Sequence, residues 1–149
     1  MDPQPSLKIV PAPVSFEPKT GQLTAMKVLI VDDDHANVAL MEAMLDEAGY
    51  KNVTSITDSR LALETCRSFQ PDLVLLDLMM PYIDGFEVLE SLRLEAGEIF
   101  LPVIILTADT NGESRLRAMH AGATDFLLKP LDHSEVLLRI ANASPSMRS

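Results

Sequence analysis

Hydrophobic and polar positions alternate in blocks along residues 26–143 of this chain. Short hydrophobic runs predict strands buried on both faces of a sheet, and the runs stop abruptly at polar residues. Four runs cover residues 26–31, 73–76, 102–106 and 124–128, and a weaker fifth covers residues 53–56. We therefore predict five strands.

The segments between the strands carry the spacing of helices that are buried on one side. Gly49, Gly97 and Gly122 supply helix stops, and Asp58 or Ser59 supplies a cap for the second helix. The positions that mark the five helices are Val38, Met41, Leu45 and Ala48; Leu61, Ala62, Thr65 and Phe69; Phe86, Leu89 and Leu92; Leu116, Met119 and His120; and Val136, Leu137 and Ile140. Five alternations of strand and helix predict an α/β fold with a parallel sheet and helices on both faces.

Polar residues that can bind a metal or take part in a reaction follow the strands at their carboxyl ends. In a parallel sheet these ends share one edge. They are an acidic triplet at residues 32–34, then Asp77, Thr107 and Lys129. Carboxylates 4 Å apart repel by about 4 kcal/mol at an effective dielectric near 20, which favours a bound cation. Oxygen ligands without cysteine or histidine favour a hard dication such as Mg²⁺. A metal, an ammonium and a hydroxyl around Asp77 would stabilise a phosphoryl group on it, which makes Asp77 a covalent acceptor rather than a general base.

Composition limits the classes of function. The chain has 149 residues, of which 47% are hydrophobic, and this suits one domain with a full-sized core. A formal net charge of -10 argues against binding nucleic acid. The apolar runs are shorter than the roughly 18 residues of a membrane span, and no signal-peptide pattern is present, so we expect a cytoplasmic protein. We predict that residues 1–25 form a proline-rich N-terminal extension and that Cys66 is an inert, buried thiol.

Four motifs in order give the chain a specific resemblance to the receiver domains of two-component response regulators. The resemblance covers nearly all of residues 26–143. The motifs are Val31-Asp32-Asp33, Asp77-Leu78-Met79-Met80-Pro81 followed by Asp84-Gly85, Thr107-Ala108, and Lys129-Pro130. The resemblance implies a flavodoxin-like (βα)5 fold, a doubly wound parallel sheet with strand order 2-1-3-4-5. The receiver domain would span residues 26–143, followed by a C-terminal tail at residues 144–149.

The resemblance also implies a metal site. Asp77 would be the phosphoacceptor. Asp33 and Asp77 would bind Mg²⁺ directly, Asp32 would bind it through water, and the backbone carbonyl of Met79 would be the third protein ligand. Mn²⁺ could replace Mg²⁺. Asp34, outside the usual acidic pair, is expected to cap the first helix.

The remaining motif residues take roles in phosphoryl binding and switching. The resemblance implies that Lys129 pairs with phosphoryl oxygens and that its peptide bond to Pro130 is cis. Thr107, followed by Ala108, would move toward the phosphoryl group. Phe126, three residues before the lysine, would be the aromatic switch residue.

The implied function is to accept a phosphoryl group from a sensor histidine kinase or a histidine phosphotransfer protein. The fourth helix, fifth strand and fifth helix, residues 111–142, would then change and control a downstream protein, or an output domain if the chain is part of a longer regulator. No membrane or direct nucleic-acid partner is expected. Beyond accepting the phosphoryl group and slowly losing it, the protein is not expected to be an enzyme. A second run on the first helix is either a docking surface for the donor or part of a wide core stripe: Ala36, Leu40, Ala43 and Met44.

Other readings of the sequence are weaker. A flavodoxin-type protein needs a phosphate loop after the first strand, where this chain has three acids. A nucleotide-binding enzyme needs a glycine-rich phosphate motif, and the sequence has none. A haloacid-dehalogenase-like phosphatase needs a second acid where this chain has Met79. A catalytically silent receiver-like interaction module is the main alternative, but it would lack the acceptor, a metal acid or the lysine, and all three are present.

Overall fold

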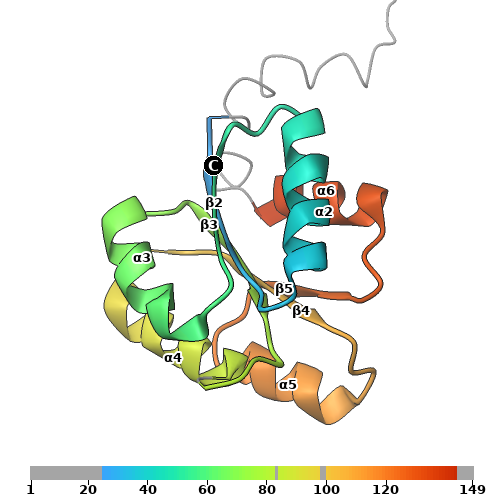
Figure 1. The fold of residues 1–149 in the computed structure, drawn as a ribbon. Helices are drawn as coiled ribbons and strands as arrows, with labels where there is room; N and C mark the ends of the chain where they lie inside the picture. Colours follow the sequence, from blue (N-terminus) through green and yellow to red (C-terminus); the bar gives the residue numbers. More distant parts are fainter. Residues whose placement is uncertain (1–24, 83, 98–99, 144–149) are drawn as a thin grey trace, which may run out of the picture.

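Strands and helices alternate along the chain as the sequence predicts. The computed structural model describes residues 25–82, 84–97 and 100–143 (Figure 1). The strands are β1 (Lys27–Val31), β2 (Asn52–Ile56), β3 (Leu73–Asp77), β4 (Val103–Thr107) and β5 (Asp125–Leu128). The helices are α2 (His35–Glu47), α3 (Ala62–Phe69), α4 (Gly85–Ala96), α5 (Gly112–His120) and α6 (His133–Ala143), with a 3₁₀ turn, η2 (Ser59–Leu61), before α3. The predicted N-terminal extension and C-terminal tail lie outside the described residues, apart from Ala25.

The five strands form one parallel sheet in the order β2-β1-β3-β4-β5. The flavodoxin-like order that the resemblance implied is therefore confirmed. The weakest of the five strand predictions, at residues 53–56, corresponds to β2, an edge strand whose residues are at most half-buried. Because all the strands are parallel, their carboxyl ends lie along one edge of the sheet.

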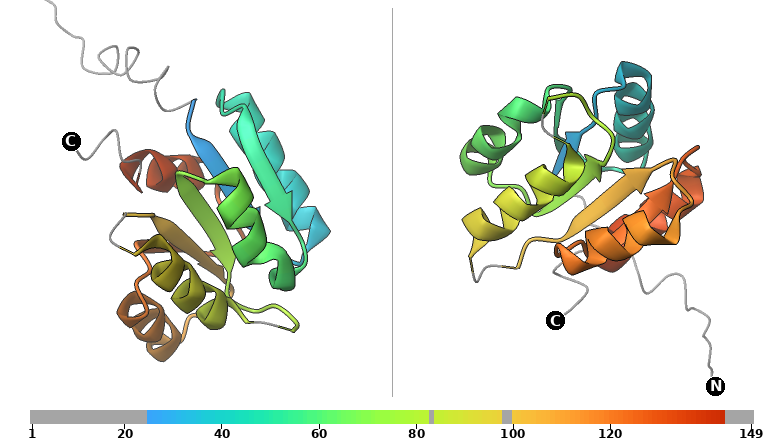
Figure 2. Two further views of the ribbon diagram at one scale, coloured as in Figure 1. Left: turned by 90° about the vertical axis from the view of Figure 1, so that its left-hand side faces the viewer. Right: turned by 90° about the horizontal axis from the view of Figure 1, so that it is seen from below.

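Helices cover both faces of the sheet (Figures 1 and 2). Helices α2 and α6 pack on one face, and α3, α4 and α5 pack on the other. Successive strand residues point to opposite faces, so Val28 and Ile30 enter the first core while Leu29 and Val31 enter the second. Each fully buried side chain of this size contributes about 1.5–3 kcal/mol to folding. The buried strand residues thus hold the sheet between two hydrophobic cores, and the polar residues follow at the carboxyl ends of the same strands.

Side-chain caps fix the helix starts at this edge. The Asp34 carboxylate accepts hydrogen bonds from the amides of Ala36 and Asn37 at 2.9 and 3.4 Å, which confirms its predicted role as the cap of α2. Asp84 caps α4 in the same way. Asp58, one of the two predicted caps for the second helix, instead caps the 3₁₀ turn η2.

The predicted inward stripes are wrong at several positions. Leu116, Met119 and His120 of α5 are exposed, and the residue of α5 that the structure buries is Ala118. Leu116 and His120 each lie two positions from Ala118, about 200° around the helix, and therefore point away from the sheet. Leu61 is 46% exposed, and it belongs to the 3₁₀ turn rather than to α3.

The side chain of Cys66 is half-buried and unpaired, and burial raises the pKa of its thiol. This agrees with an inert thiol more closely than with a nucleophile. Within the described part of the chain, no helix is both long enough and apolar enough to cross a membrane.

Candidate functional site

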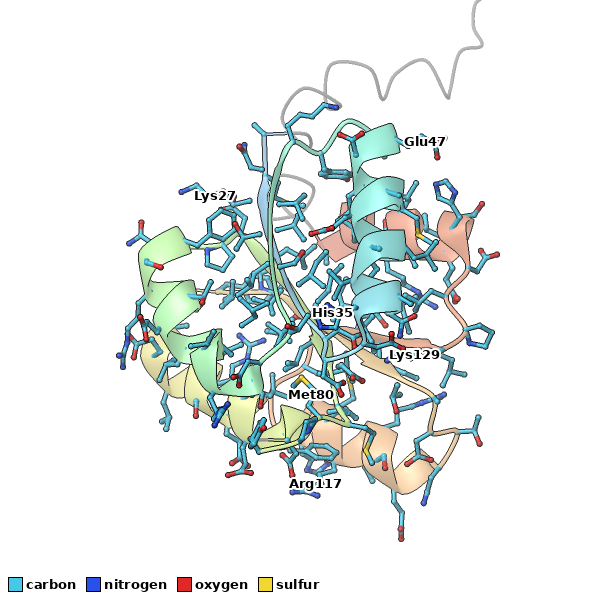
Figure 3. The ribbon with its side chains drawn as sticks, in the orientation of Figure 1. Lys27, His35, Glu47, Met80, Arg117 and Lys129 are labelled. Atoms are coloured by element: carbon cyan, nitrogen blue, oxygen red, sulfur yellow. The ribbon has the colours of Figure 1, made fainter. Side chains whose placement is uncertain are left out.

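Three carboxylates meet at the carboxyl edge of the sheet. Asp32 and Asp33 directly follow β1, and Asp77 is the last residue of β3, the neighbouring strand. Their nearest carboxylate oxygens lie within 4.8 Å of one another. In Figure 3, His35, Met80 and Lys129 lie around this end of the sheet, whereas Lys27 and Glu47 lie toward the opposite end. Parallel pairing of β1 with β3 therefore produces the predicted convergence.

One ammonium serves two buried carboxylates in this cluster. Lys129 Nζ lies 3.3 Å from Asp32 Oδ2 and 3.3 Å from Asp77 Oδ1, and the two acids are 0% and 3% exposed. Burial and the charge of Asp32 raise the pKa of Asp77 to about 7, although Lys129 and the Met79 amide act in the opposite direction. Burial alone would lower the pKa of Lys129, but the charges of Asp77 and Asp32 outweigh burial and raise it. One ammonium cannot neutralise three carboxylates, so the cluster is negatively charged when all three are ionised.

The donor atoms of the cluster fit a hard divalent cation. Asp32 Oδ1 accepts a hydrogen bond from the Asp34 amide at 2.9 Å. Asp32 Oδ2 is buried, and among the described residues it has no hydrogen-bond partner, although Lys129 is near it. A buried carboxylate oxygen whose charge is shared with one ammonium, beside two further carboxylates, suits a hard dication such as Mg²⁺ or Mn²⁺. The Met79 amide lies 3.4 Å from Asp77 Oδ1, and the Met79 carbonyl stays a predicted ligand.

The predicted switch residues lie on β4, which pairs with β3, and on β5, which pairs with β4. Thr107 ends β4 and is 4% exposed, and its Oγ1 accepts a hydrogen bond from the Asp109 amide at 3.0 Å. Ala108, which follows it, is exposed. Phe126 lies in β5 opposite Ile105, below the edge, and is half-buried. The Arg115 guanidinium sits 3.9 Å from the centroid of the Phe126 ring.

The remaining predicted features of the lysine motif are also present. The Lys129–Pro130 peptide bond is cis, as the resemblance implied. The Lys129 amide donates a hydrogen bond to the Thr107 carbonyl at 2.8 Å, which joins the ends of β4 and β5. The structure thus brings Asp32, Asp33, Asp77 and Lys129 together, with Thr107 on the adjoining strand.

A model of the response regulator receiver domain matches residues 28–141. The chain belongs to the response regulator receiver domain family. Among curated relatives, this receiver domain is 39% identical over 114 residues to the response regulator PleD of Caulobacter vibrioides, and the match covers 76% of the chain and 25% of PleD. It is 38% identical over 117 residues to the DNA-binding dual master transcriptional regulator RpaA of Synechocystis, covering 76% of the chain and 47% of RpaA.

Solved structures of similar proteins share the fold of this chain. The receiver domain superposes on the chemotaxis protein CheY4 of Vibrio cholerae with a TM-score of 0.75 and 30% identity, covering 80% of this chain and 98% of that one. The receiver domain of the sensor histidine kinase PA1611 of Pseudomonas aeruginosa, solved with a magnesium ion coordinated in its active-site cleft, gives 0.72 and 28%, covering 80% and 97%. The chain spans about a quarter of PleD and about half of RpaA, whereas it covers nearly all of these two solved chains.

Two contributors to this receiver site were not predicted from the sequence. A Cβ added to Gly85 would lie 2.5 Å from both the Asp77 carbonyl oxygen and Leu78 Cα, so only glycine lets α4 start this close to Asp77. Gly85 stood in the motif, but the motif does not reveal the contact that requires it. The Ser59 hydroxyl, from η2, donates to the Pro81 carbonyl at 2.9 Å. No spacing in the sequence indicates that contact, because it joins residues 22 positions apart.

Proposed function

We propose that this receiver domain accepts a phosphoryl group on Asp77 in a reaction that requires Mg²⁺, and that phosphorylation changes a surface that a partner protein reads. The observation that carries the proposal is the buried pair Asp32 and Asp77, bridged by Lys129 at 3.3 Å to each and joined by Asp33. The magnesium ion in the PA1611 receiver domain supports the same chemistry here. Oxygen ligands would also accept Mn²⁺.

The reaction follows from the charges at the edge. One carboxylate oxygen of Asp77 forms a bond to phosphorus while the bond from phosphorus to the donor's leaving atom breaks, and the leaving group departs with that electron pair. Asp32, Asp33 and the Met79 carbonyl would hold the divalent cation with Asp77, and the cation would neutralise phosphoryl charge when bound. Lys129 supplies a point charge to the phosphoryl oxygens, and the Thr107 hydroxyl can donate to one of them. Asp77 reacts in its ionised form, so neutralising the cluster also prepares the nucleophile.

The donor in this proposal is a histidine kinase or a histidine phosphotransfer protein. Helix α2 offers it Ala36, Leu40 and Ala43, all exposed, whereas Met44, placed with them by sequence, belongs to the core. A groove of about 540 Å³ lies beside this surface, and its lining includes Leu131 and His133 from the segment after β5. Met44 therefore belongs to the core stripe, and the docking role of the three exposed residues stays a prediction. The location of the protein in the cytoplasm stays a prediction.

The signal leaves, in this proposal, through α5, β5 and α6. Thr107 moves toward the phosphoryl group, and Phe126 follows into the space behind it. The exposed Leu116 and Met119 on α5 give a partner apolar side chains to contact. RpaA is named as a DNA-binding regulator, and the chain spans only part of that protein, so a linked output domain and a separate target are both compatible with the proposal. The domain itself turns over no external substrate beyond accepting and slowly losing the phosphoryl group.

Intact-mass spectrometry tests the proposal. With Mg²⁺ and acetyl phosphate, the wild-type chain should gain one phosphoryl group, and Asp77→Asn should gain none. Chelation of the metal should abolish the gain. A wild-type chain that stays unmodified would favour the silent interaction module, and a phosphoryl signal that persists in Asp77→Asn would remove Asp77 as the acceptor.

A further inference from the structure

The loop between β3 and α4 is held by residues from the far side of β1. This loop, residues 78–82, carries Met79, and the segment after β2 contacts it directly. We propose that Asp58, Ser59 and Arg60, here called the clamp, are positioning residues for the metal site. They fix the backbone of the loop so that its carbonyl at Met79 is available to the cation. The inference rests on the proposed Mg²⁺-dependent function and adds residues to it that lie outside the receiver motifs.

The first contact of the clamp is a buried hydrogen bond. Ser59 is 3% exposed, and its hydroxyl donates to the Pro81 carbonyl at 2.9 Å. A buried hydroxyl is costly unless it is hydrogen-bonded, so the position of Pro81 is coupled to that of Ser59. Pro81 lies two residues after Met79, and its ring limits backbone rotation there. The hydrogen bond therefore fixes a point of the loop close to the proposed ligand.

The second contact holds a strained residue. Tyr82 has a φ of 72°, a region that bulky side chains rarely adopt, and it is 71% exposed. The guanidinium of Arg60 lies 3.8 Å from its ring centroid. Asp58 holds that guanidinium with two hydrogen bonds, at 3.0 Å to Nε and 2.8 Å to Nη2. The planar fork thus presents a fixed face to the ring. Strained backbone persists where its surroundings restrain it, and the contact of Arg60 with the Tyr82 ring is one such restraint.

A residue of α4 holds the other end of the loop by a backbone hydrogen bond. The Gly85 amide donates to the Leu78 carbonyl at 2.9 Å, and the missing Cβ of Gly85 allows the approach to Asp77. Met79 and Met80 therefore lie between two fixed points, Leu78 and Pro81. Groups that orient metal ligands influence affinity even though they do not touch the metal. The pair of Arg60 and Tyr82 is exposed, so it contributes little to global stability. A strained and exposed residue at this place is better explained by the geometry of the site than by the stability of the fold.

Amide NMR titrations of the full chain with Mg²⁺ test the clamp, with urea unfolding of the same variants measured in EDTA. We expect Ser59→Ala to bind Mg²⁺ about 10-fold more weakly, at the lower end of the range for groups that orient metal ligands. Arg60→Ala and Tyr82→Leu should each weaken binding by about 2- to 5-fold, the effect of losing an exposed cation–π contact. Tyr82→Phe keeps the ring and should bind as the wild type does.

The matched control is Arg67→Ala. Arg67 is also an exposed arginine with a two-bond ion pair, to Glu95, but it contacts α4 rather than the loop. Its removal should leave Mg²⁺ affinity unchanged. Equal Mg²⁺ affinities for the wild type, Arg60→Ala and Tyr82→Leu would overturn the clamp, and this comparison holds even if Ser59→Ala fails to fold. The phosphorylation of the wild type is read separately by mass: a wild type that binds Mg²⁺ without gaining a phosphoryl group contradicts the proposed function, while the ratios of affinity still decide the clamp.

Discussion

Replacing Asp77 with asparagine should raise the free energy of unfolding near neutral pH in the absence of a divalent cation, and the gain should shrink in acid. The folded protein places this carboxylate in a buried position beside Asp32, and these two causes raise the pKa of Asp77 from 3.8 to about 7. Between those two values the folded state keeps a proton that the unfolded state has released. Stability must therefore fall as the pH rises through this window.

The magnitude follows from the size of the pKa shift. The difference between 3.8 and about 7 is roughly 3 pKa units, and at about 1.4 kcal/mol per unit it corresponds to roughly 4 kcal/mol across the whole window. Asparagine has nearly the same shape and does not ionise, so the variant should lack this pH dependence. The pKa of about 7 already includes the opposing effect of Lys129, and within the window the folded Asp77 carboxyl is protonated, so the variant loses no ion pair there. The pKa of Lys129 is itself raised from 10.5, so its titration lies above the window.

Urea unfolding of both proteins in EDTA at several pH values between about 4.5 and 8 measures the effect. The difference in unfolding free energy between Asp77→Asn and the wild type should grow as the pH rises, and it should level off above about pH 7. Adding Mg²⁺ should reduce the difference near neutrality, because a bound cation favours the ionised carboxylates. A difference that stays constant over this range would refute the reasoning about burial and repulsion.

Three further predictions follow from the site and its surroundings. Asp33→Ala should lose phosphorylation by acetyl phosphate in intact-mass spectra while its unfolding midpoint stays equal or rises, since repulsion is relieved; normal phosphorylation would exclude Asp33 from the site. Gly85→Ala should lower the unfolding free energy by about 1–3 kcal/mol, because its Cβ would meet backbone atoms at 2.5 Å, whereas Gly112→Ala, where nothing lies within 4 Å, should not. Leu40→Glu should slow phosphotransfer from the cognate donor but not from acetyl phosphate. The control is Leu94→Glu, the same substitution at an 85% exposed position on the opposite face of the sheet, and it should slow neither reaction.

The parts of the site that were predicted from the sequence are those that depend only on the strands being parallel. Asp77 and Lys129 each follow a hydrophobic run, and parallel strands bring such positions to one edge whatever the details of packing. The inward face of α5 was not predictable in the same way. Leu116 and Met119 look like core residues by hydrophobicity, whereas a single small residue, Ala118, makes the contact that lets the helix approach the sheet.

Long-range contacts set a second limit on prediction. Ser59 and Pro81 are 22 residues apart, and the hydrogen bond between them depends on how closely two loops approach across the end of β1. Neither residue type is unusual in a loop, so the sequence carries no signal of the pairing. The same holds for Arg60 and Tyr82, which are also 22 residues apart and meet only in the folded structure.

Helix α5 buries little of its surface against the sheet, and this affects how the domain fluctuates. Helix α4 buries five residues, among them Phe86 and Leu92, while α5 buries Ala118 alone. Local opening of a helix costs free energy in proportion to the apolar contacts that it breaks, so α5 should separate from the sheet far more often than α4 does. In native-state hydrogen exchange, the amides of α5 should lose protection at low denaturant while those of α4 and β3 exchange only with global unfolding. In the proposed switch, a helix this easily separated from the sheet would need only a small energetic change at Thr107 to move, and the strands that hold the acids would stay in place.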